Sequence, residues 1–327
     1  MDGQNLNTYI RCPRCGSFCV SGVNFCAFCG APIKKPESKA KRVFLTLLQC
    51  LGYIAFFFAV QFTVELVAMV IIAVQSGISS GGAFLSEDYL YSAYGRWSWL
   101  SGTVSAVICV VCYALFFKVR KKSFARQIEL RPLHPASFGG LAVCGMGGQF
   151  AAVILITVLY SLFPVLAENS VGEQLESMMQ SPYPVLDFMH IAVFTPIVEE
   201  VLFRGIVYNK MKKVMPVSAA IVVSGLVFGA AHMNIEQFMY AAPLGILMAA
   251  ALEKYGSILA PVAVHFAFNG ANYLIGLIEF SNDYWYTVMT VAGTGLLLLG
   301  IAIIFFTEKA NGRAPAGKRK LTLDETL

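Results

Sequence analysis

Charged residues are scarce in this sequence. Asp, Glu, Lys and Arg make up only 13% of the 327 residues, and 57% are hydrophobic, whereas a typical soluble domain is about 25% charged. Apolar runs long enough to cross a bilayer as helices recur along the chain. The composition therefore excludes an ordinary soluble globular protein. It predicts an all-α polytopic membrane protein, preceded by a small cysteine-rich segment.

Targeting signals and a charge pattern for nucleic-acid binding are also missing. The N-terminus is polar and cysteine-rich, so we expect no cleavable signal peptide, and the first apolar helix should act as the insertion signal and stay in the membrane. The net charge is only +5, and the basic residues lie mostly in short segments between apolar runs, so we expect no nucleic-acid partner. The end of the chain, Asp324–Leu327, is not a prenylation signal.

The apolar runs predict about eight transmembrane helices. Basic residues gather in every second connection, with Arg96 as the exception in the other connections. Under the positive-inside rule this pattern places both termini in the cytoplasm of a multi-pass protein in a bacterial-type plasma membrane. The expected organisation is a ribbon at 1–33, a basic linker at 34–42, a membrane domain at 43–306 and a cytoplasmic polar tail at 307–327. The predicted spans are 43–74, 97–117, 138–163, 185–209, 216–233, 237–252, 257–278 and 285–306.

Five of the nine cysteines lie close together near the N-terminus. Two Cys-x-x-Cys pairs occur there, and each is followed by a glycine that permits a tight turn around the thiolates. Four thiolates suit a closed tetrahedral zinc site. The alternative is a disulfide pair, which a reducing cytosol disfavours. The predicted structural zinc ligands are Cys12, Cys15, Cys26 and Cys29, with Cys19 as a spare thiol that could replace one of them.

The N-terminal segment resembles the short zinc-ribbon domains found at the ends of many bacterial proteins. A segment of this size cannot hold a core without a metal. Four cysteine ligands leave no open coordination position, so a structural role, or binding of a protein partner, is favoured over catalysis. The other four cysteines lie in or beside apolar segments and are interpreted as small packing residues.

Two adjacent carboxylates, Glu199 and Glu200, lie inside the apolar run from Val185 to Met211. Ionisable groups at bilayer depth cost roughly 3 kcal/mol each, and they persist where they pair or face a polar cavity. Glu200 and Arg204 are i,i+4 neighbours and are predicted to form a structural pair. Glu199 is turned about 100° around the helix, so it is left free for chemistry.

Two later apolar segments carry a polar residue at helical spacing. The first reads Phe228-Gly-Ala-Ala-His232, in which small residues let another helix come close. The second reads His265-Phe-Ala-Phe-Asn269, in which the imidazole and the carboxamide share one helix face.

These groups suit attack by water on a carbonyl. A carboxylate can take a proton from water, and an imidazole beside it can hold the water. A second imidazole and a carboxamide can donate hydrogen bonds to the developing oxyanion. Glu199 with His232, facing His265 with Asn269, supplies both halves. The same four groups could instead ligate a divalent metal such as zinc that activates the water, and the sequence leaves both alternatives open.

Taken in order, the three motifs resemble those of the CAAX protease and bacteriocin-processing (Abi) family of intramembrane endopeptidases. The likeness covers about residues 140–306, which would be the protease-like core. It implies that Glu199 and His232 activate water, that His265 and Asn269 form the oxyanion site, and that two further residues, Glu200 and Arg204, support them. The family has been described both as metalloproteases and as glutamate-dependent proteases, so the metal stays open. Family substrates imply a membrane-bound protein or peptide as partner, within the lipid bilayer.

Two other classes of function remain as alternatives. One is a non-catalytic membrane scaffold that recruits partners through its ribbon. The other is a small-solute or proton transporter, because transporters also use intramembrane Glu, Arg and His. The predicted function is an intramembrane endopeptidase, which should lose most of its activity on Glu199→Gln.

Overall fold

The computed structural model describes residues 9–33, 38–79, 87–169, 182–276, 278 and 283–311. The chain divides into two compact units, Met1–Leu48 and Gln49–Leu327. Residues 34–37 of the predicted linker and 312–327 of the predicted tail lie outside the described residues. The predicted domain boundaries therefore stay predictions.

The first unit contains two antiparallel strands, β1 (Tyr9–Arg11) and β2 (Phe18–Val20), followed by an isolated bridge between Phe25 and Pro32. A Cys-x-x-Cys pair lies inside each of these two hairpins. The buried residues of this unit are three cysteines with one alanine and one isoleucine. So little apolar area cannot by itself offset the conformational entropy of folding, which makes a metal cross-link the natural source of stability.

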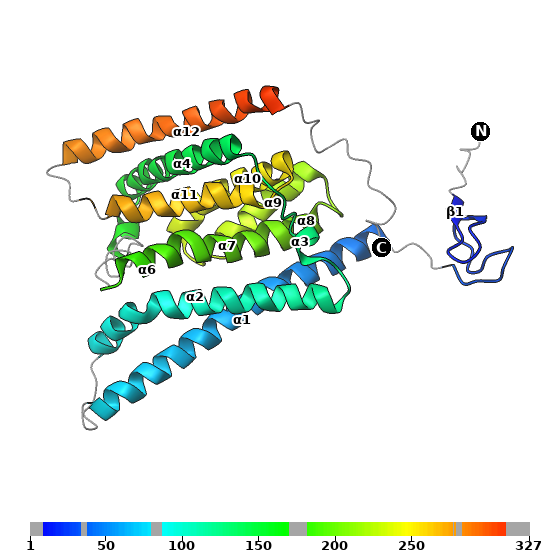
Figure 1. Ribbon diagram of the computed structural model, residues 1–327, viewed down its shortest axis with the longest axis horizontal. Coiled ribbons are helices and arrows are strands. Elements are labelled where there is room, and N and C mark those ends of the chain that lie inside the picture. The colour runs from blue at the N-terminus through cyan, green and yellow to red at the C-terminus, as the bar shows by residue number, and fades with distance from the viewer. Residues whose placement is uncertain are drawn as a thin grey trace. The chain divides into compact units, whose positions relative to one another are not determined.

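The second unit is helical (Figure 1). Each of the eight predicted apolar segments is helical, which confirms the all-α class. About three quarters of α1, from Gln49 on, falls in this unit. Its helices are α1 (Lys39–Ser79), α2 (Glu87–Val119), α3 (Phe124–Gln127), α4 (Pro135–Leu162), η1 (Pro164–Asn169), α6 (Pro184–Phe188), η2 (Met189–Phe194), α7 (Thr195–Glu200), η3 (Val201–Tyr208), α8 (Asn209–Met211), α9 (Val217–Ala230), α10 (Ile235–Tyr255), α11 (Leu259–Gly276) and α12 (Asp283–Asn311).

Five helices in the described part of the chain are long and apolar enough to cross a membrane, namely α1, α2, α4, α10 and α12. The apolar helix α9 has only 14 residues. The 18-residue α11 carries one histidine and two asparagines, which lower its hydropathy. The run from α6 to α8 is divided into short pieces by changes of helix type. The predicted count of eight spans is therefore not confirmed and stays a prediction.

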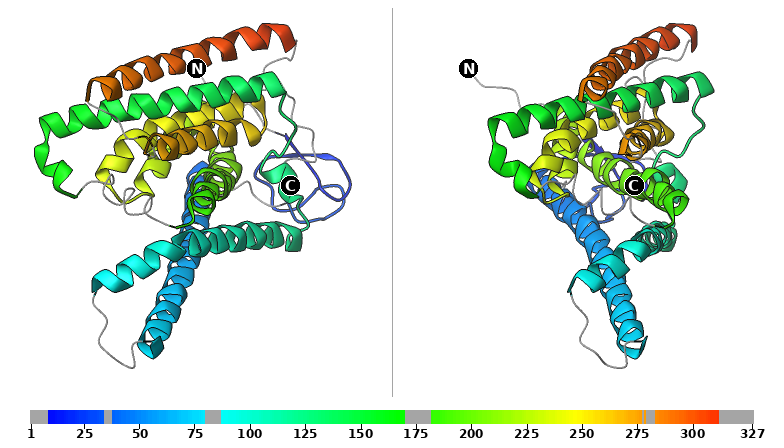
Figure 2. Two further views of the ribbon diagram at one scale, coloured as in Figure 1. Left: turned by 60° about the vertical axis from the view of Figure 1, so that its left-hand side comes forward. Right: turned by 90° about the vertical axis from the view of Figure 1, so that its left-hand side faces the viewer.

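The helix α4 holds α11 and α12 close together. It packs against both helices, and α12 lies along it in every view (Figures 1 and 2). Two glycines of α4 show how close this approach is. A Cβ added at Gly145 would clash with the Val264 carbonyl oxygen on α11, and one added at Gly147 would clash with the Leu297 nitrogen on α12. Small residues at such contacts allow backbones to approach in membrane helices. The packing fixes α11, which carries His265 and Asn269.

Candidate active site

The helix that carries the two adjacent carboxylates changes its winding on both sides of them. It is π-helical from Met189 to Phe194 (η2), α-helical from Thr195 to Glu200 (α7), and π-helical again from Val201 to Tyr208 (η3). Pro196 has no N–H to donate to the preceding turn, which accounts for the change at the end of η2. Short π-helical turns occur frequently at functional sites. A continuous α-helix was expected here, so this irregularity is a new feature.

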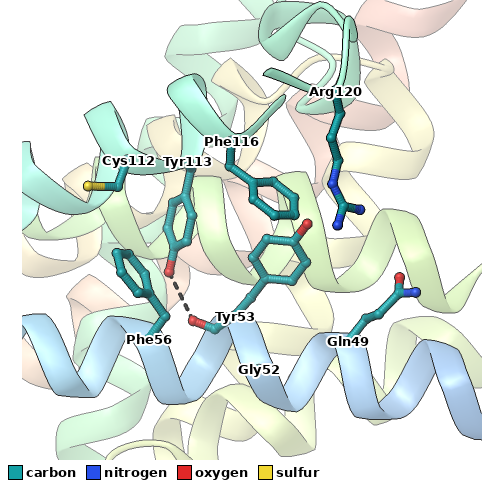
Figure 3. Close-up of a pocket in the computed structure, with 8 residues that line it drawn as sticks. All are labelled: Gln49, Gly52, Tyr53, Phe56, Cys112, Tyr113, Phe116 and Arg120. Atoms are coloured by element: carbon teal, nitrogen blue, oxygen red, sulfur yellow. Dashed lines mark hydrogen bonds between the residues drawn. The ribbon is translucent and has the colours of Figure 1, made fainter. Parts of the chain in front are cut away.

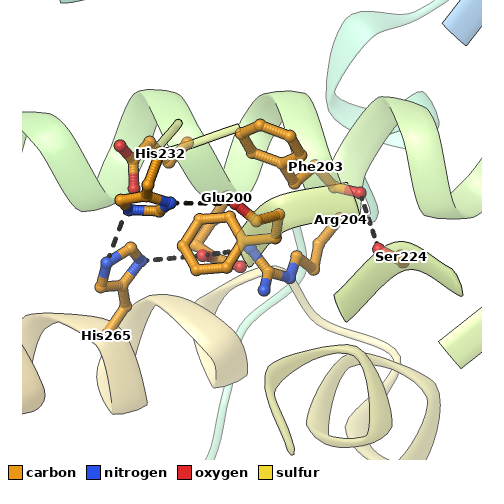
Figure 4. A network of polar contacts seen from close by, with 8 residues as sticks. Glu200, Phe203, Arg204, Ser224, His232 and His265 are labelled. Carbon is orange, nitrogen blue, oxygen red and sulfur yellow. Dashed lines mark hydrogen bonds and ion pairs between the residues drawn. The ribbon is translucent and has the colours of Figure 1, made fainter. Parts of the chain in front are cut away.

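Glu200 lies at the centre of a buried polar contact. Its Oε1 accepts a hydrogen bond from Arg204 Nη1 at 2.9 Å, as the i,i+4 spacing predicts, and lies 2.8 Å from His265 Nδ1 (Figure 4). The side chains of Glu200 and Arg204 are 0% exposed. The carboxylate therefore joins its own helix to α11, a tertiary contact that helical spacing could not reveal.

The Arg204 guanidinium is enclosed by α9 and α10. Its central carbon lies 4.2 Å from the centroid of the Phe228 ring, which suits a cation–π contact. A Cβ added at Gly245 would lie 3.0 Å from Arg204 Nη2. Glycine at this position leaves room for the guanidinium between the two helices.

Glu199 differs from Glu200 in its accessibility. Its side chain is 15% exposed, and its Oε2 lies 3.6 Å from Nε2 of His265. Because the other ring nitrogen of His265 faces Glu200, the imidazole lies between the two carboxylates. Among the described residues, the imidazole that contacts Glu199 is His265, whereas the sequence analysis paired Glu199 with His232. Of the two carboxylates, Glu199 is the more accessible one.

His232 lies in the turn that follows α9. Its Nδ1 is 2.9 Å from the Phe228 carbonyl oxygen, which can only accept a hydrogen bond. Nδ1 is therefore the donor in this contact, which leaves Nε2 free to accept a hydrogen bond in that tautomer. The Phe228 ring lies 5.0 Å from the His232 ring and 5.7 Å from the His265 ring, between centroids. Phe228 thus brings the two predicted histidines to one place, together with Glu200 and Arg204 (Figure 4).

Asn269 lies one turn after His265 on α11 and reaches the same helical run. Its Nδ2 donates to the Ile191 carbonyl in η2 at 3.0 Å. One amide N–H is thereby used to hold α11 against η2, and a carboxamide has a second N–H to offer. A turn further along, Asn272 accepts a hydrogen bond of 2.7 Å from Gln149 on α4.

Tyr240 on α10 is a neighbour of the site that the sequence analysis missed. Its ring stacks on Phe268 with centroids 5.9 Å apart, and Phe268 lies on α11 between His265 and Asn269. No motif surrounds this tyrosine, so the sequence offered no signal for it.

The cysteine cluster of the first unit forms a candidate metal centre. The four predicted Sγ atoms all lie within 4.8 Å of one another, and the Cys12–Cys29 and Cys15–Cys26 pairs are 3.5 and 3.6 Å apart. Tetrahedral zinc with Zn–S bonds of about 2.3 Å would set these distances near 3.8 Å. In the part of the chain that the structure describes, this is the only group of three or more His, Cys, Asp or Glu side chains whose ligand atoms converge in this way.

The backbone around the two cysteine pairs repeats. Gly16 N–H donates to the Cys12 carbonyl at 3.0 Å, and Gly30 N–H donates to the Cys26 carbonyl at 2.9 Å. Both glycines have a positive φ, +74° and +68°, which other residues rarely adopt. Although burial raises the pKa of the Cys26 thiol, backbone N–H groups of Phe28 and Cys29 lower it to about 6. The residues fit a zinc ion that is held by thiolates.

The membrane site also has donors that zinc accepts, namely Glu199 and the imidazoles of His232 and His265. The Nδ1 atom of each histidine faces an oxygen, and this is how metal-ligating histidines are commonly oriented. The donor types therefore suit a divalent metal, although among the described residues only the cysteine ligand atoms of the first unit converge.

Comparison with known proteins supports the family resemblance. Residues 181–271 match the family model "Type II CAAX prenyl endopeptidase Rce1-like". This part of the chain is therefore similar to that family. The matched segment contains all six residues singled out in the membrane motifs, and it confirms the predicted resemblance to the CAAX protease family.

One curated relative adds to the Rce1-like match. Over 194 residues the chain is 23% identical to the Bacillus subtilis (strain 168) protein named "Putative membrane peptidase YdiL", covering 58% of this chain and 75% of the relative. No solved structure gave a significant match to the chain. At a general level the comparisons support an intramembrane peptidase.

Proposed function

We propose that the protein is an intramembrane endopeptidase that hydrolyses a peptide bond of a membrane-associated or lipid-anchored polypeptide. The observation that carries the proposal is the unequal environment of two adjacent carboxylates. Glu200 is buried and held by Arg204 and His265, while Glu199 is partly accessible beside the same imidazole. Pairs of titratable groups in contrasting environments are typical of acid–base sites.

In the proposed mechanism Glu199 acts as the base. Its carboxylate takes a proton from water, and the water oxygen bonds to the carbonyl carbon of the peptide, whose π electrons move to the carbonyl oxygen. The Nε2 atom of His232 accepts a hydrogen bond from the same water. When the tetrahedral intermediate collapses, the C–N bond breaks and the proton held by Glu199 passes to the leaving nitrogen. The products are a new carboxyl end and a new amino end.

The negative charge that develops on the carbonyl oxygen needs hydrogen-bond donors. The second N–H of Asn269 is one of them, and His265 is the other when its ring is protonated on both nitrogens. An imidazolium there would keep one N–H on Glu200 and direct the other towards the Glu199 side. Such fixed donors are worth more in a water-poor site than in solution, because less solvent screens them.

A divalent metal at the site would alter the roles of the same residues. Glu199, His232 and His265 would hold the metal, which would supply Lewis-acid activation of water. In that case Glu200 and the Phe228 carbonyl orient the two imidazoles through their Nδ1 atoms.

We further propose that both termini lie in the cytoplasm of a multi-pass protein in a bacterial-type plasma membrane, and that the zinc ribbon binds a protein partner. The first statement rests on the alternating basic connections. The second rests on the closed four-thiolate geometry, which leaves no position for chemistry.

The proposal is tested with the full chain in nanodiscs and a panel of membrane-anchored peptides, in water enriched in ¹⁸O. The expected result is a shortened peptide with one ¹⁸O atom in its new carboxyl group, measured by mass spectrometry. Ion-coupled flux into vesicles without any peptide product would contradict the proposal and favour a transporter.

A further inference from the structure

The helices α1 and α2 cross through a cluster of aromatic rings. Tyr53 on α1 packs edge-on against Tyr113 and Phe116 of α2, with ring centroids 5.9 and 5.3 Å apart, and Phe56 packs against Tyr113 at 5.6 Å. The Tyr113 hydroxyl donates to the Tyr53 carbonyl at 3.0 Å (Figure 3). This crossing lies away from the residues of the candidate active site.

A pocket of about 430 Å³ opens beside these rings (Figure 3). Its volume lies within the usual range of ligand sites, about 300–1,000 Å³. Most of its lining is aromatic and apolar. The lining residues are Gln49, Gly52, Tyr53, Phe56, Cys112, Tyr113, Phe116 and Arg120. The Tyr113 hydroxyl donates its hydrogen bond to a backbone carbonyl, and of the lining residues named above Arg120 alone is charged.

One end of the pocket is cationic. Arg120 directly follows the apolar span of α2, which ends at Val119, and its guanidinium lies 4.2 Å from the centroid of the Phe116 ring. Within the described ranges, Arg120 has no carboxylate partner. Lys210 donates to Gln49 Oε1 at 2.8 Å and lies 5.3 Å from the Tyr53 ring.

The pocket has an aromatic, apolar part and a cationic end, so a ligand that fills it needs an apolar part and an anionic group. The apolar part lies within two helices that are long and apolar enough to cross a membrane, and the cationic part lies where the apolar span of α2 ends, the level at which headgroups are expected. Basic pockets between transmembrane helices suit the phosphates of lipid headgroups. A soluble anion would leave the aromatic part empty, and an uncharged hydrocarbon would leave Arg120 without a partner.

We propose that this pocket binds an anionic phospholipid. The phosphate bonds to Arg120 and Lys210, and one acyl chain lies along the rings of Tyr53 and Phe116. The bound lipid contacts α1 and α2 together, so it helps to hold these two helices against each other. This site is separate from the proposed peptidase site, and nothing in the proposed reaction depends on it.

Native mass spectrometry of the purified full chain, equilibrated with equal amounts of phosphatidylglycerol and phosphatidylcholine, tests the proposal. The wild type should retain phosphatidylglycerol at least about fivefold more than phosphatidylcholine, because the choline of phosphatidylcholine brings a positive charge to a cationic end of the pocket. Arg120→Gln is an exposed substitution and should reduce the preference to near unity. Glycerol 3-phosphate, which carries the phosphate without acyl chains, should not displace the lipid.

Gly52→Leu tests the apolar half. A Cβ added at Gly52 meets no atom within 4 Å, so the new side chain extends into the open pocket without a clash. This variant should retain at least about fivefold less phosphatidylglycerol than the wild type, a loss of roughly 1 kcal/mol. Gly139→Leu is the matched control, because a Cβ there also meets nothing within 4 Å and lies on another helix. Equal retention of both lipids by the wild type, or unchanged retention in Gly52→Leu, would overturn the proposal.

Discussion

His265 Nδ1 lies 2.8 Å from Glu200 Oε1, and both side chains are almost completely buried. This contact fixes the rotation of the imidazole. With Nδ1 held by Glu200, Nε2 must face the other way, towards Glu199 at 3.6 Å. The two adjacent carboxylates therefore have different roles. Glu200 orients the His265 ring, and Glu199 lies beside Nε2 of the same ring on the more accessible side.

Glu200→Gln should destabilise the protein. The substitution removes the charge that pairs with the fully buried Arg204, and an unpaired buried charge costs about 3–5 kcal/mol. Thermal unfolding of the detergent-purified protein should show a lower midpoint than the wild type. Glu199→Gln is the control. Because Glu199 is partly exposed, this variant should unfold near the wild-type temperature. An unchanged midpoint in Glu200→Gln would show that the buried pair contributes no stability.

Gly245→Ala should also destabilise the protein, for a steric reason. The new Cβ would lie 2.8 Å from the Gly225 Cα and 3.0 Å from Arg204 Nη2, which forces α9 and α10 apart. Such overpacking typically costs about 1–3 kcal/mol. Gly139→Ala is the control, since its Cβ meets nothing within 4 Å. The same thermal assay measures both variants, and equal midpoints would contradict the close packing around Arg204.

Zinc content should depend on four of the five N-terminal cysteines. We expect about one zinc per chain in the wild type and almost none after Cys12→Ser or Cys26→Ser, because a structural site needs all four ligands. Cys19→Ser should keep its zinc, although Cys19 Sγ lies 3.5 Å from Cys26 Sγ. Elemental analysis of the purified full chain measures this. Loss of zinc from Cys19→Ser with retention in Cys12→Ser would reassign the ligands.

The features that the sequence predicted correctly are those with a local period. The apolar runs located the helices, and i,i+4 spacing located the contact between Glu200 and Arg204. The repeated Cys-x-x-Cys-Gly pattern predicted two matching turns, which the structure has at Gly16 and Gly30. The small residues before His232 predicted a close helix approach, and a Cβ at Gly229 would lie 2.8 Å from the Ala242 Cβ.

The features that could not be predicted from the sequence depend on tertiary packing. An α-helical wheel cannot anticipate the π-helical turns on either side of α7, because they depend on how this helix packs. The contact between Glu200 and His265 spans 65 residues of sequence, and the hydrogen bond from Asn269 to Ile191 spans 78. The predicted number of membrane spans stays a prediction, since α9 is short and polar residues lower the hydropathy of α11.

The most direct test of the account is a cleavage assay that compares Glu199→Gln with Glu65→Gln in the full chain. Both variants lose one carboxylate from an apolar helix, but Glu65 lies on the exposed side of α1 and makes no ion pair within the described residues. With membrane-anchored peptides in nanodiscs, Glu65→Gln should cleave like the wild type. Glu199→Gln should lose at least about 100-fold in rate, which is the usual contribution of a general base. Equal cleavage by the two variants would contradict the assignment of Glu199 as the base.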